Sequence, residues 1–212
     1  VDAIIVADMG IFSLAKRVAP GLELHVSTQA STTNWHTVQM WKELGATRVV
    51  AAREVSLADL KEMKDHVDIE IESFVHGSMC ISYSGRCLLS NYMTGNRDAN
   101  RGQCSQSCRW KYSLVESNRP GEYYPIEEDE HGTYIFNSKD LCLIHRIPDL
   151  YEAGIDSLKI EGRMKSVHYC ATVAKVYRTA IDTYLKEGKD WYVRPEWIAE
   201  LEKISHRPYT DG

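Results

Sequence analysis

Residues 47–75 read TRVVAAREVSLADLKEMKDHVDIEIESFV. The apolar run Thr47–Ala51 predicts a buried strand, and a second strand-like run follows at Ile69–Val75. Between them, Ser56 is a typical helix N-cap, and the apolar residues after it recur at helical spacing. These residues are Leu57, Leu60, Met63 and Val67. A strand, a helix and a strand joined by such short connections are typical of a parallel sheet or barrel.

The same alternation extends to both sides of this stretch. Further strands are predicted at Ala3–Ala7, Leu22–Val26 and Ser157–Ile160, and further helices at Gly10–Val18, Trp35–Leu44, Cys142–Ala153 and Met164–Lys186. This gives about five parallel strands, whereas a closed eight-stranded barrel needs ~250 residues. The sequence therefore predicts an α/β fold, a partial TIM-like barrel whose N-terminal βα units are absent, with a doubly wound open sheet as the alternative. Because the chain opens on a strand-like run without an initiator Met, we interpret it as a piece of a longer protein.

The alternation breaks at residues 77–137. This segment is rich in Cys, Gly, Ser, Asn and Arg, and two antiparallel strands are predicted in it, at Lys111–Glu116 and Gly132–Asn137, around the acidic stretch Glu116–Glu130. We expect four parts: barrel units at 1–76, a Cys-rich insertion with a β-hairpin at 77–137, barrel units at 138–190 and a tail at 191–212. The insertion follows the C-terminal end of a strand, where the active sites of such barrels lie.

The composition excludes several classes of protein. The chain has 212 residues and a net charge of −5, so as a whole it is not an electrostatic nucleic-acid binder. There is no run of 18 apolar residues, so no membrane-spanning helix is expected. The first residues do not resemble a signal peptide, which predicts a cytoplasmic protein. Because disulfides are rare in the cytoplasm, the six cysteines favour a metal or redox role.

Five of the six cysteines lie in or near the insertion, with the spacing Cys80-x6-Cys87-x16-Cys104-x3-Cys108-x33-Cys142. Neither the paired CxxC knuckles of zinc ribbons nor the common ferredoxin spacings match. Gathered thiols in a polar segment still favour a soft metal or an iron–sulfur cluster over free structural cysteines, zinc or disulfides. Since four ligands complete a cubane cluster, one of the five is a spare. The sixth cysteine, Cys170, lies on the apolar stripe of a predicted helix and is expected in the core.

The local charge of the insertion differs from that of the chain. Between residues 86 and 111 there is one acidic residue, Asp98, against five basic residues, with three aromatic residues interleaved. The basic residues are Arg86, Arg97, Arg101, Arg109 and Lys111, and the aromatic residues are Tyr92, Trp110 and Tyr112. Such cations lower the pKa of thiols, or bind an anionic substrate or RNA phosphates. A solvated loop with scattered arginines is the simpler interpretation.

Other candidates for chemistry lie at the predicted strand ends. Glu72, Phe74 and His76 share one face if their strand continues, so that Glu72 and His76 are candidates for acid–base work or, alternatively, for a polar barrel lining. The cations near other strand ends suit a phosphate or carboxylate, although an ion pair of Glu161 with Arg163 is equally consistent. These cations are Arg53, Lys159, Arg163 and Lys165. The sequence has no HExxH, G-x-S-x-G or Walker A motif.

Several motifs resemble peptidase family U32, the collagenase-like family of unassigned mechanism. They are Glu72–Cys80 (ESFVHGSMC), Ser84–Ser90 (SGRCLLS), Asn91–Gly102 (NYMTGNRDANRG), Asn137–Cys142 (NSKDLC) and Lys159–Ser166 (KIEGRMKS). The resemblance covers most of the chain. It implies a TIM-like barrel and a [4Fe–4S] cluster held by Cys80, Cys87, Cys104 and Cys142, with Cys108 as the rival fourth ligand.

Within the family, the sequence is most similar to the branch that hydroxylates the wobble uridine of tRNA to 5-hydroxyuridine. The resemblance implies prephenate, a dicarboxylate, as co-substrate and tRNA as partner, with contributions from segments absent here. We therefore expect an RNA hydroxylase. Its expected catalytic residues are Glu72, His76 and Arg163, and its expected substrate-binding residues are Arg53, Arg86, Lys159 and Lys165. A collagenase-like peptidase and a non-catalytic iron–sulfur partner in a hydroxylation complex are the alternatives.

Overall fold

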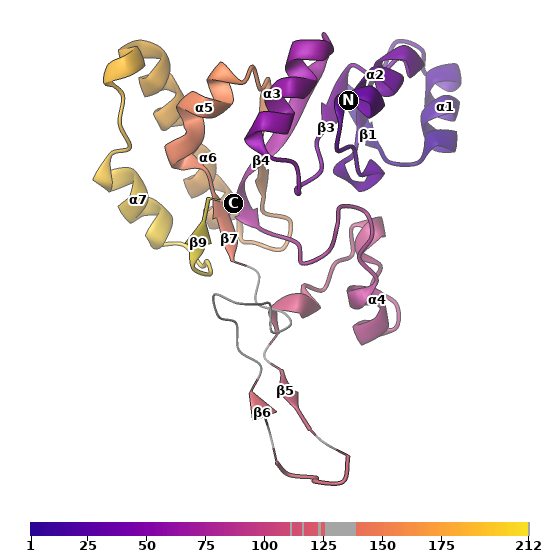
Figure 1. Ribbon diagram of the computed structural model, residues 1–212, viewed down its shortest axis with the longest axis vertical. Coiled ribbons are helices and arrows are strands. Elements are labelled where there is room, and N and C mark those ends of the chain that lie inside the picture. The colour runs from indigo at the N-terminus through magenta and orange to yellow at the C-terminus, as the bar shows by residue number, and fades with distance from the viewer. Residues whose placement is uncertain (111, 116, 123, 126–138, 212) are drawn as a thin grey trace. The chain divides into compact units, whose positions relative to one another are not determined.

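The computed structural model describes residues 1–110, 112–115, 117–122, 124–125 and 139–211 (Figure 1). The chain forms two compact units. The first unit comprises Val1–Met79, Tyr83–Gly85 and Lys139–Gly212, and the second comprises Cys80–Ser82 and Arg86–Ser138. None of the described helices combines the length and the apolar composition that a bilayer-spanning helix needs.

The first unit is built on a seven-stranded, mainly parallel sheet (Figure 1). Its strands are β1 (Ala3–Val6), β2 (Glu23–Val26), β3 (Arg48–Val50), β4 (Glu70–Ser78), β7 (Asp140–Cys142), β8 (Ser157–Glu161) and β9 (Tyr209–Thr210). Parallel pairing runs from β1 through β2 and β3 to β4, and β8 also pairs parallel to β4. The five predicted parallel strands are thus present. Over the described residues the sheet is open, so a closed barrel is not seen.

Six α-helices belong to the first unit, and side-chain caps fix several of their starts. They are α1 (Met9–Val18), α2 (Trp35–Leu44), α3 (Leu57–His66), α5 (Ile147–Glu152), α6 (Val167–Glu187) and α7 (Pro195–Glu202). The predicted N-cap Ser56 accepts a hydrogen bond from the Asp59 backbone N–H, and the Asp59 side chain completes a capping box. Gly45 ends α2 in the left-handed region at φ +99°. These two predicted helix boundaries are confirmed.

The prediction of a helix from Cys142 to Ala153 is wrong in its first half. Asp140–Cys142 forms β7, which pairs antiparallel with β4, and a 3-10 turn at Ile144–Arg146 leads into α5. Pro148 lies in the first turn of α5, where its missing N–H costs nothing. The tail also contains a strand that we did not predict, β9, which pairs with β7. Both strands are too short to show a periodic pattern in sequence.

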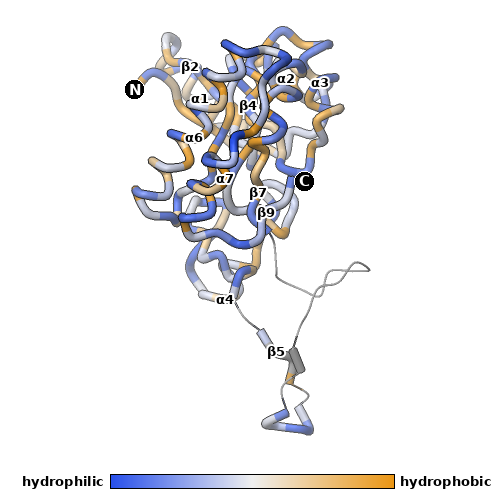
Figure 2. The backbone as a smooth tube through the Cα atoms, turned by 90° about the vertical axis from the view of Figure 1, so that its left-hand side faces the viewer, coloured by the Kyte–Doolittle hydropathy of each residue, from blue (hydrophilic) through white to orange (hydrophobic). Residues whose placement is uncertain are grey.

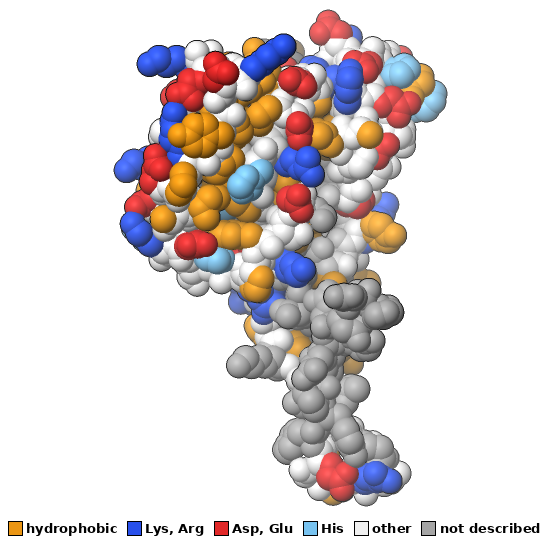
Figure 3. Space-filling model, turned by 60° about the vertical axis from the view of Figure 1, so that its left-hand side comes forward, with side chains coloured by type: hydrophobic (Ala, Val, Ile, Leu, Met, Phe, Trp, Pro, Cys, Tyr) orange, Lys and Arg blue, Asp and Glu red, His pale blue; other side chains and the backbone are white. Residues whose placement is uncertain are grey.

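Buried side chains of the first unit form two large hydrophobic clusters and one small one. One large cluster joins β1–β4 to α1–α3, and the other packs α5, α6 and α7 together. In Figure 2 the hydrophobic segments concentrate in this sheet and its helices. Aromatic rings extend the second cluster outward, with Tyr184 edge-on to both Tyr151 (5.4 Å) and Trp191 (5.8 Å). Figure 3 shows hydrophobic side chains gathered over this face.

A glycine allows β4 and β8 to approach closely. Gly77 has φ +108°, and a Cβ built on it would lie 2.2 Å from the backbone oxygen of Glu161. Gly77→Ala is expected to lower the free energy of unfolding by about 2–4 kcal/mol, since it combines this clash with left-handed strain. Gly95→Ala is the control, because Gly95 is left-handed at φ +76° but has open space around it, so that about 1 kcal/mol of strain is expected. Urea denaturation of both variants measures the difference, and equal losses would contradict the close approach.

The second unit is mostly irregular. It contains α4 (Leu89–Thr94), the short 3-10 turns η2 (Ala99–Arg101) and η3 (Ser107–Arg109), and the two-residue strands β5 (Ser113–Leu114) and β6 (Tyr124–Pro125). Strands β5 and β6 pair antiparallel, with Ser113 opposite Pro125 and Leu114 opposite Tyr124. The predicted strand Gly132–Asn137 and much of the acidic stretch lie outside the described residues.

Candidate functional site

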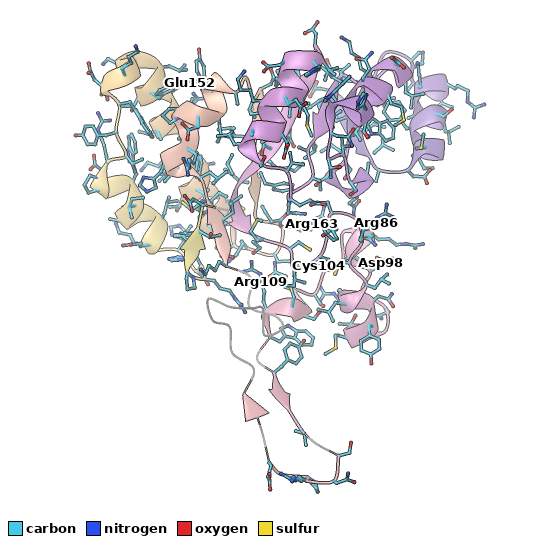
Figure 4. The ribbon with its side chains drawn as sticks, viewed as in Figure 1. Arg86, Asp98, Cys104, Arg109, Glu152 and Arg163 are labelled. Atoms are coloured by element: carbon cyan, nitrogen blue, oxygen red, sulfur yellow. The ribbon has the colours of Figure 1, made fainter. Side chains whose placement is uncertain are left out.

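Four thiols of the second unit lie close enough for their charges to interact. Burial raises the pKa of the Cys108 thiol, and the thiols of Cys80, Cys104 and Cys87 raise it further, while Arg109 lowers it. None of these cysteines forms a disulfide. The sequence therefore brings together residues that are up to 28 positions apart, from Cys80 to Cys108. Cys104 and Arg109 are labelled in Figure 4 with Arg86 and Asp98, all from the segments around α4.

The loop that carries Cys104 is held by hydrogen bonds from both sides. Arg97 donates through Nε to the Gln103 carbonyl (3.2 Å) and through Nη2 to the Cys104 carbonyl (3.3 Å). On the other side, Ser90 Oγ of α4 accepts the Ser105 backbone N–H at 2.9 Å. Arg97 thus serves the fold of this loop rather than facing a ligand. These bonds fix the backbone from which the Cys104 and Cys108 side chains project.

Gln106 is a feature that the sequence did not reveal. It adopts φ +54° in the left-handed region, which is uncommon for a non-glycine residue. In this conformation its backbone N–H donates to Cys104 Sγ at 3.3 Å. N–H donors to sulfur are typical of iron–sulfur sites, where they stabilise the charged thiolate. No pattern in the sequence marks a left-handed glutamine, so this donor required the structure.

The fifth candidate thiol, Cys142, lies in the first unit. It is buried in the hydrophobic cluster of α5–α7, and the Tyr177 hydroxyl lies 4.0 Å from its Sγ. In register it faces His76 on β4, whereas Asp140 faces Ser78. Cys170, expected in the core, is partly buried against the same cluster and donates to the Gly162 carbonyl at 3.6 Å.

The four thiols of the second unit match in number the ligands of a [4Fe–4S] cluster. Among the described residues, no group of three or more His, Cys, Asp or Glu side chains has the spacing to hold one metal ion. A [4Fe–4S] cluster takes four thiolates, one at each iron, so its ligand sulfurs need not converge on one atom. The mutual charge effects on Cys108, the nearby Arg109 and the Gln106 N–H together suit such a centre.

Within the first unit, the short stretch Tyr83–Gly85 is bonded to residues that follow the strands. Ser84 Oγ donates to Glu54 Oε2 (3.0 Å) and accepts the Arg53 backbone N–H (3.1 Å). Next to it, Gly85 (φ +72°) passes so close to Gln29 that a Cβ would lie 2.0 Å from the Gln29 carbonyl oxygen. Ser84 and Gly85, which belong to the first unit, are therefore held close to the segments that follow β2 and β3.

Glu72 is the centre of a buried charge network. Its carboxylate accepts hydrogen bonds from Lys159 Nζ (2.8 Å) and Ser157 Oγ (2.8 Å), and Arg48 Nη1 lies 3.3 Å away. Burial raises the pKa of Glu72, but the bonds and charges of Lys159, Ser157 and Arg48 outweigh it and bring the pKa below its ordinary value. The carboxylate is therefore ionised and paired, as suits a polar lining, and Lys159 is bound to it.

Arg53 lies at the C-terminal end of β3, above an aromatic ring. Its guanidinium is 4.0 Å from the Phe74 ring centroid, and Nη2 is 3.8 Å from Glu161 Oε2 at the end of β8. Arg163 follows two residues later and is exposed, with its backbone N–H bonded to Glu161 Oε1 at 3.0 Å. Glu161 thus pairs with the guanidinium of Arg53 and accepts a hydrogen bond from the backbone of Arg163. Arg86 belongs to the second unit and is also exposed.

His76 does not share a face with Glu72 and Phe74, as we had expected. The pairing of β4 with β8 shifts between Phe74 and His76, because β4 carries one extra residue at a bulge. His76 consequently packs against Tyr177 (5.5 Å between ring centroids), Tyr169 (6.1 Å) and Tyr209 (5.3 Å). Glu72 and His76 are therefore not brought together as an acid–base pair.

The surroundings of His76 keep it neutral. Its side chain is 1% exposed, and neither ring nitrogen has a hydrogen-bond partner among the described residues. Burial lowers its pKa to about 4, with His206 and Lys165 acting in the same direction and Asp140 against them. Asp140 is fully buried, and its Oδ2 forms an ion pair with Lys165 Nζ at 3.6 Å. Lys165 Nζ also donates a hydrogen bond to the Ser205 carbonyl at 2.8 Å. Lys165 is thus tied to the C-terminal tail.

This shift predicts a pH-dependent stability. The unfolded His76 takes up a proton below about pH 6.5, but the folded one resists it until about pH 4, so stability is lost as the pH falls through this window. The loss is expected to be about 3 kcal/mol at pH 4. In His76→Phe this loss of stability between pH 6.5 and pH 4 is expected to be absent. Denaturant unfolding of both proteins between pH 7 and pH 4 measures the difference, and parallel curves would show that His76 titrates normally.

Comparison of the sequence with known proteins identifies one family and several similar proteins. The profile described as "Peptidase family U32" matches residues 1–212. The "tRNA hydroxylation protein P1" of Bacillus subtilis (strain 168) is 53% identical over 98% of this chain and 49% of its own length. The "tRNA hydroxylation protein P" of Escherichia coli (strain K12) is 41% identical over the whole chain and 54% of its own length. The "23S rRNA 5-hydroxycytidine C2501 synthase" of the same strain is 36% identical, over the whole chain and 32% of its own length. The chain spans about half the length of the first two relatives.

Proposed function

We propose a function on the premise that the chain belongs to peptidase family U32. It is part of an enzyme that hydroxylates RNA, with the wobble uridine of tRNA as substrate. The observation that carries this proposal is the 53% identity, over 98% of the chain, with a protein named for tRNA hydroxylation. A relative named as an rRNA 5-hydroxycytidine synthase supports the same reaction type, since both names describe the addition of a hydroxyl group to RNA.

The proposed reaction replaces the C5–H bond of uridine by C5–OH. If a donor D–OH supplies the hydroxyl group and leaves as D–H, atoms and electrons balance without a further oxidant. Prephenate, which the family resemblance implies, is the proposed donor, and it carries two carboxylates. Arg53 and Arg163 are the proposed carboxylate ligands, because they follow the C-terminal ends of β3 and β8.

A [4Fe–4S] cluster is the proposed cofactor, held by Cys80, Cys87, Cys104 and Cys108. The mutual effect of these four thiols, all within the second unit, supports Cys108 as the fourth ligand. When bound, such a cluster supplies an iron Lewis acid or an electron relay. The chain's own part is to hold the sulfurs: Arg97 fixes the backbone of the Cys104 loop, and Gln106 donates to Cys104 Sγ.

The first unit is proposed to be part of a TIM-like barrel, completed by segments outside this chain. Its parallel strands β1–β4 and β8 and the charged side chains around Glu72 support this, since a polar lining suits an interior closed by further strands. The cysteines follow the C-terminal end of β4, where barrel enzymes carry their sites.

Peptidase activity is not proposed. The hydroxyl of Ser78 is buried without a hydrogen-bond partner among the described residues, and His76 beside it in sequence is equally unpaired there. A serine nucleophile needs a base within hydrogen-bond reach. Neither residue has one in the described part of the chain.

Nucleoside analysis of tRNA tests the proposed function. RNA from a strain that lacks the full-length gene is expected to lose 5-hydroxyuridine and its derivatives, and the wild-type gene to restore them. A gene that encodes Arg53→Gln is expected to restore them only when the concentration of the proposed co-substrate, prephenate, is raised. Unchanged tRNA in the deletion strain, or gelatin cleavage by the purified protein, would contradict the proposal.

A further inference from the structure

The second unit exposes aromatic side chains that its own fold does not use. Tyr92 on α4 is 84% exposed, and Trp110, just after η3, is 45% exposed. The Trp110 ring stacks on Tyr112, with centroids 6.5 Å apart and planes 28° from parallel. Helix α4 and η3 are in contact, so Tyr92 and Trp110 lie on neighbouring segments. An exposed ring gains little from burial, so the fold does not explain Tyr92, and Trp110 leaves nearly half of its surface open to a ligand.

The charge around these rings is opposite to that of the chain. Residues 86–110 contain four arginines and one aspartate, a net charge of +3, within a chain whose net charge is −5. Arg97 is used internally, but the side chain of Arg101 is 83% exposed and lies 3.9 Å from Asp98. Arg86 is exposed as well. We name Tyr92, Trp110, Arg86 and Arg101 the aromatic–arginine surface.

Exposed rings beside arginines match one kind of ligand best. Single-stranded nucleic acid offers unstacked bases, which stack on aromatic rings, and a phosphate backbone, which binds arginine. A duplex hides its base faces, so it would leave the rings unused. An enzyme that modifies a base must also take that base out of its stack.

We propose that the aromatic–arginine surface binds single-stranded RNA, with bases stacked on Tyr92 and Trp110 and a phosphate at Arg101. This inference rests on the proposed function, whose substrate is RNA. It assigns recognition of the single strand to the second unit, which also carries the four clustered thiols.

Fluorescence anisotropy of the full-length protein, purified without oxygen, tests the inference. The probe is a fluorescein-labelled single strand of uridine-rich RNA, compared with the same strand annealed to its complement. Tyr92→Ala and Trp110→Ala are each expected to weaken single-strand binding at least about fivefold without changing its salt dependence. Arg101→Gln is expected to reduce the slope of log affinity against log salt by about 0.7.

Tyr151→Ala is the matched control, because Tyr151 is 59% exposed on α5 of the first unit. It is expected to bind like the wild type, and unchanged iron content and melting temperature verify that each variant is folded. Wild-type affinity in both aromatic variants, or equal binding of single strand and duplex, would overturn the inference. So would variants that bind RNA normally but lose a protein partner.

Hydroxylation is measured separately in the same preparations. Protein that binds the single strand through Tyr92 and Trp110 but forms no hydroxylated nucleoside would contradict the proposed function and support this inference. Hydroxylation with unchanged RNA binding in the aromatic variants would support the function and overturn the inference.

Discussion

Replacing Cys108 with alanine is expected to abolish cluster binding, whereas replacing Cys142 leaves it intact. The thiol of Cys108 is buried among Cys80, Cys87 and Cys104, and loss of one of four thiolates leaves one iron without its protein ligand. Cys142 lies in the hydrophobic cluster of α5–α7 in the first unit. We expect RNA hydroxylation to disappear with the cluster in Cys108→Ala.

Iron per chain and visible absorbance of the full-length variants, purified without oxygen, measure this effect. Cys170→Ala is a second control, since Cys170 packs against the same hydrophobic cluster as Cys142. Full iron content in Cys108→Ala together with loss of iron in Cys142→Ala would show that Cys142 is the fourth ligand. That result would refute the grouping of thiols proposed here.

Glu72→Gln is expected to lower the free energy of unfolding by about 3–5 kcal/mol, the range for breaking a buried charge pair by removing one partner. The substitution keeps the shape of the side chain but leaves the ammonium of Lys159 without its carboxylate and removes a partner of Arg48. Denaturant unfolding at pH 7 measures the loss.

Glu70→Gln is the matched control on the same strand. Glu70 also pairs with Arg48, at 2.6 Å, but its side chain is half exposed, so a change of about 1 kcal/mol or less is expected. The pKa of folded Glu72 is depressed, so its contribution is present above the unfolded pKa and lost as the pH falls through the folded pKa. Below that pH range, the free energies of unfolding of the Glu72→Gln and wild-type proteins are expected to converge. Similar losses in both variants at pH 7 would mean that Glu72 is not a buried network centre.

The parallel strands could be predicted because each carries apolar residues, in a run as in β1 or in alternation with polar residues as in β8, between clear helices. The strand β7 could not, since Asp140 is polar and Cys142 continues into an apolar stretch that is typical of a helix. The bulge before His76 left no trace in the sequence, because an extra residue changes the facing of a side chain but not its identity.

The residues of the candidate site could also be predicted only in part. Spacing identified the gathered cysteines, since thiols in a polar segment are unusual, but it left Cys108 and Cys142 as rivals. The structure adds that Cys108 interacts with the other three thiols within the second unit, whereas Cys142 is buried near Tyr177 in the first unit. Among the predicted cations, Lys159 and Lys165 proved to be bound by buried carboxylates, which sequence spacing does not encode.

The most direct measurement of the central claim is the amount of iron and acid-labile sulfide in the unaltered full-length protein, purified and assayed without oxygen. If the thiols of the second unit share one inorganic centre, about four atoms of each are expected per chain. A single bound zinc or iron ion without sulfide, or a metal-free protein that still hydroxylates RNA, would contradict the account.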